Sequence, residues 1–363
     1  MFLRLSGFIL SIALLVFVIF QKKIRKWGKV GLVVVALFLV LFMAYLNIFP
    51  RHPAPHPTGD MVVRTDTVFY RYESNLADML THGNEREIPI KVWYPDGAEE
   101  NQHPLLIFSP GSFGTAESNE TMYLELASRG YVVMGISHPY HSFSSKMSDG
   151  RTIRANSGFL WSVVTSEGVK NMEGNLASLR EWTQVRIDDI NVILDKLLDA
   201  QIDNEYESLI DRERIVLSGH SLGGAAALAV GRDRCEEIRA MVVLEAPFAR
   251  DIIGIDGDQY VFTDEAYPLP ILHVYSDSLI TTMDEIATYE MNVRLLHSDN
   301  PMYVNKHISG VGHLGLTDMA LLSPILTNML DRGADTRKAP ETLLELNRYV
   351  LEFLDEFVSA STP

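Results

Sequence analysis

The sequence predicts an α/β protein built on a mostly parallel, eight-stranded sheet with helices on both faces. Short apolar runs of the kind that form buried parallel strands alternate with segments of helical period. This alternation is typical of a sheet whose parallel strands are joined by helical crossovers. The chain has 363 residues, 47% of them hydrophobic, so it can bury a hydrophobic core on both faces of such a sheet.

The individual elements follow from this pattern. Two opening strands, expected at 62–72 and 88–94, should pair antiparallel. Further strands, mostly buried and parallel, are expected at 105–108, 131–136, 215–218, 241–244, 271–275 and 303–308. Helical periods occupy 121–128, 184–200, 223–230 and 316–330, and a final amphipathic helix begins at Pro340.

One segment, 139–180, interrupts the alternation of strand and helix. It is rich in polar residues and follows a strand at the edge where α/β sheets bind ligands. An insertion of this length is seldom an inert loop. We interpret it as a lid or a pocket wall, with a surface excursion as the alternative.

The first fifty residues form a separate, membrane-spanning part. Two apolar runs, 5–20 and 30–49, flank the basic segment 21–29, and residues 1–50 contain six basic residues and no acidic one. The second run is long enough to cross a bilayer. The first is as short as a signal-peptide core, but a basic stretch follows it in place of a small-residue cleavage site. We therefore expect a hairpin of two transmembrane helices.

The basic loop also predicts the orientation of this hairpin. Short basic loops remain cytoplasmic, which places the large body on the extracytoplasmic side. Residues 51–59 are rich in proline and are expected to form a stiff spacer that lifts the body off the membrane. The α/β domain then occupies 60–363.

Composition excludes several classes of partner and cofactor. The residues after position 50 carry 25 basic and 47 acidic side chains, a net charge of −22, which disfavours nucleic acid. A single cysteine, Cys235, excludes an internal disulfide and leaves too few thiolates for a structural zinc site.

No phosphate-cradling glycine loop is present in the sequence, so a nucleotide cofactor is not expected. His138 and His141 lack a carboxylate at ligand spacing, and Asp256-Gly257-Asp258 lacks the other ligands of a calcium loop, so no cofactor or metal is expected.

The strongest motif is Gly219-His220-Ser221-Leu222-Gly223. It stands between a predicted strand and a helix start rich in small residues. This is the strand–turn–helix context of a nucleophile elbow, in which a serine occupies a strained turn with tiny neighbours. The sequence therefore predicts the α/β-hydrolase fold with Ser221 as the nucleophile.

A serine needs a base within hydrogen-bond reach, and on this fold the acid and the histidine follow the serine in the chain. Four downstream histidines are candidates. His273 and His307 lie in strand runs, His297 lies in a polar loop, and His313 follows the last strand in a glycine-rich loop. His313 has the position expected of the base.

The acid has two candidates. Glu245 ends the strand that follows the nucleophile strand, and Asp277 ends the next one. Either could fix the imidazole tautomer and stabilise the imidazolium. We favour Glu245, because no acid occurs a few residues beyond Asp277, where the later position usually has it.

The oxyanion of the tetrahedral intermediate needs backbone N–H donors. Leu222, the residue after the nucleophile, offers one. The other is expected in the loop after the strand at 105–108, where Gly111 lets the backbone approach the substrate and Ser112 carries the N–H.

Several stretches resemble the platelet-activating-factor acetylhydrolase-like and dienelactone-hydrolase-like serine esterases of the α/β-hydrolase superfamily. The similarity spans about 86–358. It is carried by 108–111, 126–133, 219–224, 243–246 and 310–313. The resemblance implies that Glu245 is the acid, that Ser112 and Leu222 form the oxyanion hole, and that the substrates are esters with short acyl groups, including phospholipids. This chain has glutamate where the family has aspartate, and Pro110 where the family usually has histidine.

These features together predict a membrane-anchored hydrolase of carboxylic esters with a Ser221–His313–Glu245 triad. The same groups could cleave amides or peptides. In a third interpretation, the body is a catalytically silent binding module tethered by the hairpin. The presence of nucleophile, base and oxyanion donors favours the enzyme.

Overall fold

The computed structural model describes residues 2–50, 52–165, 171–199, 204–333 and 335–359. Its centre is an eight-stranded sheet of order β1-β2-β4-β3-β7-β8-β11-β12. β1 and β2 pair antiparallel, β2 pairs antiparallel with β4, and the other neighbours are parallel. The strands are β1 (Val63–Glu73), β2 (Glu85–Pro95), β3 (His103–Ser109), β4 (Val132–Ile136), β7 (Ile210–His220), β8 (Ala240–Leu244), β11 (Ile271–Ser276) and β12 (Tyr303–Ile308).

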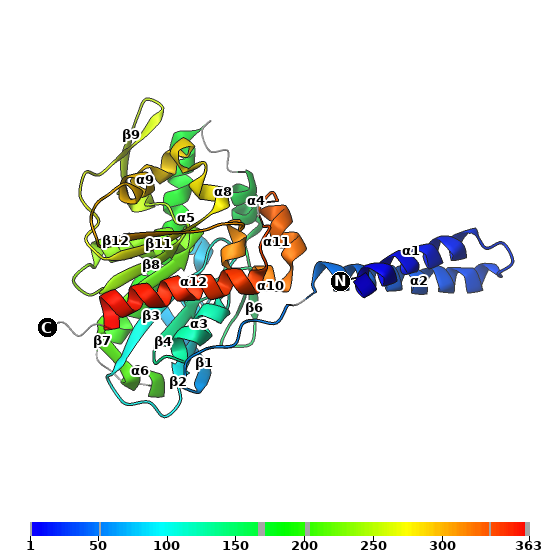
Figure 1. The fold of residues 1–363 in the computed structure, drawn as a ribbon, viewed down its shortest axis with the longest axis horizontal. Coiled ribbons are helices and arrows are strands. Elements are labelled where there is room, and N and C mark those ends of the chain that lie inside the picture. The colour runs from blue at the N-terminus through cyan, green and yellow to red at the C-terminus, as the bar shows by residue number, and fades with distance from the viewer. Residues whose placement is uncertain (1, 51, 166–170, 200–203, 334, 360–363) are drawn as a thin grey trace.

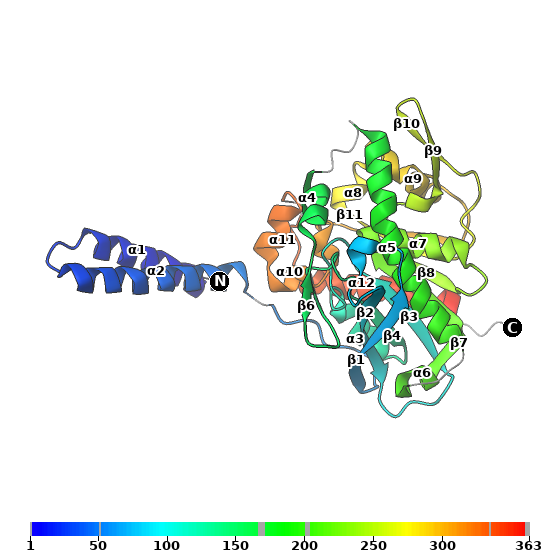
Figure 2. The same ribbon diagram turned by 180° about the vertical axis from the view of Figure 1, so that it is seen from behind.

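Helices cover both faces of this sheet. Leu106 and Phe108 of β3 point into the core beneath α3 and α12, which lie in front in Figure 1. Leu105 and Ile107 belong to the opposite core, beneath α5 and α7, which lie in front in Figure 2. Successive strand residues thus enter opposite layers, which is why these strands read as uninterrupted apolar runs.

The remaining elements connect or flank the sheet. The helices are α1 (Phe2–Phe20), α2 (Lys26–Ile48), α3 (Glu120–Ala127), α4 (Ser157–Thr165), α5 (Met172–Leu198), α6 (Glu205–Leu209), α7 (Ser221–Asp233), α8 (Asp277–Ile280), α9 (Glu290–Leu296), α10 (Met319–Leu322), α11 (Pro324–Leu330) and α12 (Ala339–Leu354). Two small hairpins are formed by β5 (Ser144–Lys146) with β6 (Thr152–Arg154), and by β9 (Ile252–Asp256) with β10 (Gln259–Phe262).

Two helices differ markedly from the sequence expectation. The helix expected at 184–200 already begins at Met172, where the Asn171 side chain accepts the N–H of Gly174 at 3.0 Å. The segment 139–180 therefore contains β5, β6, α4 and the first turns of α5, while residues 166–170 lie outside the described residues. The helix expected at 316–330 is divided into α10 and α11, because Pro324 starts a new helix that Ser323 caps.

The acidic turn at 256–258 lies in a β-hairpin that the sequence analysis did not predict. Asp256 ends β9, Gln259 begins β10, and Gly257 has a positive φ of 60°. An Asp-Gly pair suits a tight two-residue hairpin because glycine adopts positive φ without strain. The Asp256-Gly257-Asp258 motif thus has a backbone role.

The N-terminal helices α1 and α2 pack side by side and project away from the body (Figure 1). Both are long and apolar enough to cross a membrane by length and composition. The proline-rich residues after them do not stand off from the body. The N–H of His52 donates to Leu321 O at 2.8 Å, and the N–H of Thr58 donates to the Glu125 carboxylate at 2.8 Å. These bonds hold the spacer against the surface, since an extended chain leaves its N–H groups free to bond there.

Candidate active site

Ser221 occupies the sharp turn between β7 and α7. Its φ is 52°, in the left-handed region that non-glycine residues seldom adopt. The turn is possible because the residues two positions before and after Ser221 are glycines. A Cβ on Gly223 would lie 2.1 Å from Ser109 O, and one on Gly219 would lie 2.6 Å from Gly224 N. The motif thus forms a tight elbow that presents Ser221 at the carboxyl edge of the sheet.

His313 and Glu245 meet at this same edge. The Nδ1 atom of His313 lies 2.6 Å from Oε2 of Glu245. Glu245 directly follows β8, is fully buried, and has a positive φ of 45°. Its other oxygen, Oε1, accepts the N–H of Ser276 at 2.5 Å. Both carboxylate oxygens are therefore engaged, and the carboxylate holds the imidazole through one of them.

Asp277, the alternative acid, is used elsewhere. Its Oδ1 pairs with Nε2 of His307 at 2.7 Å, and its Oδ2 accepts the N–H of Gly310 at 2.7 Å. Asp277 therefore anchors the start of the loop that leads to His313, and the structure brings Glu245, not Asp277, to the imidazole.

The other candidate histidines have different surroundings. His273 is buried in β11, and its Nε2 accepts the N–H of Ala246 at 3.1 Å, which fixes the chain just after Glu245. His307 is half-exposed on β12 beside Asp277, and His297 follows the end of α9. Of the four, His313 is the one that contacts Glu245.

The surroundings of His313 favour its protonated form. Burial lowers the pKa of the imidazole, but the hydrogen bond and the charge of Glu245, together with the charge of Asp331, raise it, and the net shift is upward from 6.5. Asp331 also accepts the N–H groups of Leu314 and Gly315 at 2.9 and 3.1 Å, which holds the chain directly after His313. The same carboxylate thus positions the base and acts on its charge.

His220, inside the elbow, also contacts His313. Its ring lies 4.3 Å from the ring of His313 between centroids, and its Nε2 donates to His313 O at 3.1 Å. Burial and the nearby His313 hold the pKa of His220 well below 6.5, so it is neutral and can donate only through Nε2. Within the described residues, the Ser221 hydroxyl has no hydrogen-bond partner, and catalytic hydrogen bonds often form fully only when substrate is bound.

The expected oxyanion donors lie at the elbow. Gly111 packs so closely that a Cβ there would lie 2.9 Å from Nδ1 of His220 and 3.2 Å from Cβ of Ser221. The next residue, Ser112, has no bonding partner for its N–H among the described residues, whereas the N–H of Phe113 is used by His141 O at 3.1 Å. Leu222 is the second residue of α7, and the first N–H groups of a helix have no intrahelical partner. Two free N–H groups therefore flank Ser221.

A buried polar network under this loop was not expected from the sequence. Arg186 of α5 is fully buried, donates to Nδ1 of His141 at 2.6 Å, and reaches Gly111 O at 3.4 Å. The sequence singled out His138 and His141 only as an improbable metal pair. Within the described residues, no cluster of metal-ligand side chains occurs.

Asp189, one turn further along α5, joins this network to the sheet. It binds Arg86 through two bonds of 2.8 Å, and its Oδ2 lies 2.8 Å from Nδ1 of His138. Nε2 of His138 in turn contacts Ser109 Oγ at 2.9 Å. Arg186 and Asp189 are three positions apart in an otherwise apolar helix face, and this spacing was the available sequence signal.

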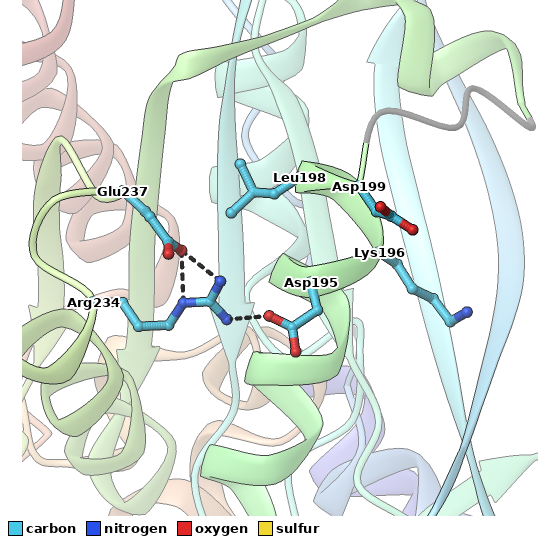
Figure 3. A pocket seen from close by; sticks show the side chains of 6 residues that line it. All are labelled: Asp195, Lys196, Leu198, Asp199, Arg234 and Glu237. Atoms are coloured by element: carbon cyan, nitrogen blue, oxygen red, sulfur yellow. Dashed lines mark hydrogen bonds and ion pairs between the residues drawn. The ribbon is translucent and has the colours of Figure 1, made fainter.

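A pocket elsewhere on the body is lined mainly by charged groups (Figure 3). It lies at the C-terminal end of α5, away from the carboxyl edge of the sheet that holds Ser221. Arg234 bonds Asp195 at 2.7 Å and Glu237 at 2.6 Å there. Both partners neutralise the Arg234 guanidinium, and Lys196, the other cationic side chain that lines the pocket, has its Nζ over the Tyr70 ring, 5.7 Å from the centroid.

The sheet order and the chain order Ser221, Glu245, His313 define the α/β-hydrolase class of architecture. Comparisons with known proteins agree with this architecture. In structure, the chain is similar to a ferulic acid esterase from Streptomyces cinnamoneus, with a TM-score of 0.63 and 18% identity over 86% of this chain and 95% of that one. In sequence, it is 25% identical over 191 residues to the platelet-activating factor acetylhydrolase of Bos taurus.

The sequence match covers 48% of this chain and only 40% of that relative. No family model matches the chain. The two similarities confirm the resemblance expected from the sequence, to serine esterases of the α/β-hydrolase fold.

Proposed function

We propose that this protein is a membrane-anchored serine hydrolase that cleaves carboxylic esters, with short acyl or lipid-type substrates. The observation that carries the proposal is the 2.6 Å hydrogen bond between Glu245 and His313 at the edge where the strained Ser221 projects. The choice of ester over amide is supported by the similar proteins, one an acetylhydrolase and the other an esterase.

In the proposed reaction, Nε2 of His313 accepts the Ser221 proton while Oγ attacks the ester carbonyl. The N–H groups of Ser112 and Leu222 stabilise the oxyanion, and the partial positive charge at the N-terminus of α7 favours it further. His313 then gives its proton to the departing alkoxide, leaving an acyl group on Ser221. A water molecule, deprotonated by His313, attacks this ester, and the proton returns to Ser221 as the carboxylic acid leaves.

The proposal also includes the location of the site. The hairpin α1–α2 spans the membrane with its basic segment, residues 21–29, on the cytoplasmic side, so the body lies outside the cytoplasm. Alkaline phosphatase fused after Phe49 tests this topology. An active fusion supports it, and an inactive but stable fusion reverses it.

The chemistry is tested by labelling the full chain with a fluorophosphonate, which reacts with activated serines. We expect labelling of the native chain and none of Ser221→Ala, together with hydrolysis of p-nitrophenyl acetate by the native chain alone. A Ser221→Ala variant with full esterase activity would refute the assignment. Faster cleavage of a matched p-nitroanilide than of the ester would identify an amidase, and an unlabelled native chain would identify a silent module.

A further inference from the structure

The helices next to the hairpin present an uncharged, apolar surface. The segments 157–165 and 314–330 contain one charged residue between them, Asp318, and its carboxylate is bonded to Thr121. The rest of the body is strongly acidic, so this surface stands out from it. The exposed large apolar side chains on it, here called the α4–α11 surface, are Leu160, Trp161, Leu322, Ile325, Met329 and Leu330.

These large apolar side chains are mostly exposed to solvent instead of packing into the core of the body. Trp161 is 69% exposed, Met329 is 65% exposed and Ile325 is 58% exposed. Contiguous exposed apolar groups mark a surface that meets another apolar phase. Figures 1 and 2, which view the molecule from opposite sides, both show α4, α10 and α11 at the end of the body from which the hairpin projects.

Direct bonds fix the position of this surface relative to the hairpin. Ser323, between α10 and α11, donates its hydroxyl to Ile48 O, at the last residue of α2, at 2.5 Å. His52 N then bonds Leu321 O at 2.8 Å. α2 has 23 residues, a length of about 35 Å, which barely exceeds a bilayer core of about 30 Å. If α2 spans the membrane, its C-terminal end and the bonded α10–α11 turn lie at the same membrane surface.

We infer that the α4–α11 surface rests on the lipid bilayer that holds the hairpin; this inference rests on the proposed membrane anchoring. Tryptophan and aliphatic side chains with little charge nearby are suited to the interface between head groups and acyl chains. A lipid surface is favoured over a protein partner because the hairpin itself brings the bilayer to this position.

This contact has a consequence for the active site. Phe159 of α4 packs against Phe113, next to Ser112, with ring centroids 5.3 Å apart. Asp331, which follows α11, holds the N–H groups beside His313. α4 therefore contacts the loop that contains Ser112, and the residue that follows α11 holds the loop that contains His313. Esters dissolved in the same bilayer are expected to reach Ser221 from that side.

The test uses the full chain reconstituted in phosphatidylcholine vesicles, in a Cys235→Ser background. A single cysteine is introduced by Ile325→Cys, or by Ile253→Cys as the matched control, and labelled with an NBD fluorophore. Ile253 lies on β9, is 64% exposed, and is remote from the hairpin in Figure 1. We expect the label at 325 to be blue-shifted and quenched by nitroxide lipids, and the label at 253 to be quenched by aqueous iodide.

Equal access of iodide to both labels would overturn the inference. Protection at 325 that appears only at high protein-to-lipid ratios would overturn it too, because it would indicate contact between copies. A chain that fails to float with the vesicles would refute the anchoring and the surface together, while p-nitrophenyl acetate hydrolysis still tests the chemistry separately.

Activity gives a second readout. The double variant Trp161→Asp, Ile325→Asp should lose at least about tenfold in turnover of a long-chain p-nitrophenyl ester dissolved in the vesicles, because two apolar side chains that contact the bilayer are replaced by charged ones. Its hydrolysis of water-soluble p-nitrophenyl acetate should match that of native protein, as should both activities of Ile253→Asp. Equal losses on both substrates would contradict a role at the bilayer.

Discussion

Oε2 of Glu245 and Nδ1 of His313 are 2.6 Å apart, although 68 positions separate the two residues in the chain. The relationship depends on two local features. Glu245 has a positive φ where it leaves β8, and its second oxygen is fixed by the N–H of Ser276. These features accommodate a side chain one methylene longer than the aspartate that the family resemblance implies.

The first prediction concerns this pair. Glu245→Gln should lower kcat by about 10²- to 10⁴-fold with little change in KM, because the amide neither stabilises the imidazolium nor favours the productive tautomer. Steady-state kinetics on p-nitrophenyl acetate measure the effect. Asp277→Asn is the matched control, since Asp277 contacts His307 and Gly310 instead. If Asp277→Asn lost activity and Glu245→Gln kept it, the acid would be Asp277.

The second prediction is the pH dependence of the reaction. His313 acts as a base only when neutral, and its pKa is raised above 6.5, chiefly because Glu245 outweighs burial. kcat/KM should therefore rise with pH and reach half its maximum above pH 6.5. In Glu245→Gln the midpoint should move to lower pH, because the raising charge is gone. A midpoint that does not move would show that Glu245 does not act on the catalytic base.

Much of this arrangement was predictable from local pattern. The buried strands form apolar runs, and the Gly219–Gly223 elbow can form only where nearby residues are tiny, so the strand positions and the turn at Ser221 followed from the sequence. His313 followed from chain order. The choice between Glu245 and Asp277 could not be settled in this way. It depends on which carboxylate the packing turns toward the imidazole.

Other features depend on contacts between distant segments. Arg186 contacts Gly111 across 75 positions, and no local pattern encodes that distance. The spacer after α2 was expected, from its prolines, to be a stiff segment that lifts the body off the membrane. Its hydrogen bonds to Leu321 and Glu125, which hold it on the surface of the body, could not be predicted from its composition. The start of α5 was missed because polar residues and Gly174 dilute its helical period.

The third prediction tests Arg186. Its guanidinium reaches Gly111 O, and that carbonyl belongs to the same peptide group as the N–H of Ser112. A donor at the carbonyl polarises the peptide and strengthens its N–H as a donor to the oxyanion. Arg186→Met should therefore lower kcat by roughly tenfold and leave KM nearly unchanged, because the oxyanion is present only in the transition state. The readout is kcat and KM on p-nitrophenyl acetate.

Arg180→Met is the control for Arg186. Arg180 lies on the same helix, is exposed, and bonds Ile252 O. It should retain both kinetic constants. Partial recovery of kcat in Arg186→Lys would support a role for the charge. A rise in KM alone in Arg186→Met would instead indicate that the residue only shapes the pocket.

The last prediction concerns stability and uses Asp318. Burial raises the pKa of this carboxyl to about 7, although hydrogen bonds from Thr121 lower it, and nearby Glu120 raises it further. Because the folded pKa lies above the unfolded value of 3.8, the folded state favours the protonated form. Its contribution to stability is fully present below pH 3.8 and is lost as pH rises through about 7. Above that, the charged carboxylate is buried at a cost.

Asp318→Asn removes this charge and keeps an oxygen to accept the N–H of Thr121. The melting temperature of the variant minus that of the native protein should therefore increase between pH 5 and pH 9, by a few degrees for a chain of this size, at about 2–4 °C per kcal/mol. Scanning fluorimetry of the full chain in detergent measures it. The matched control is Asp258→Asn, which removes the same charge from an exposed turn and should leave the melting temperature nearly unchanged. A flat profile for Asp318→Asn would mean that its carboxyl is not protonated near neutral pH.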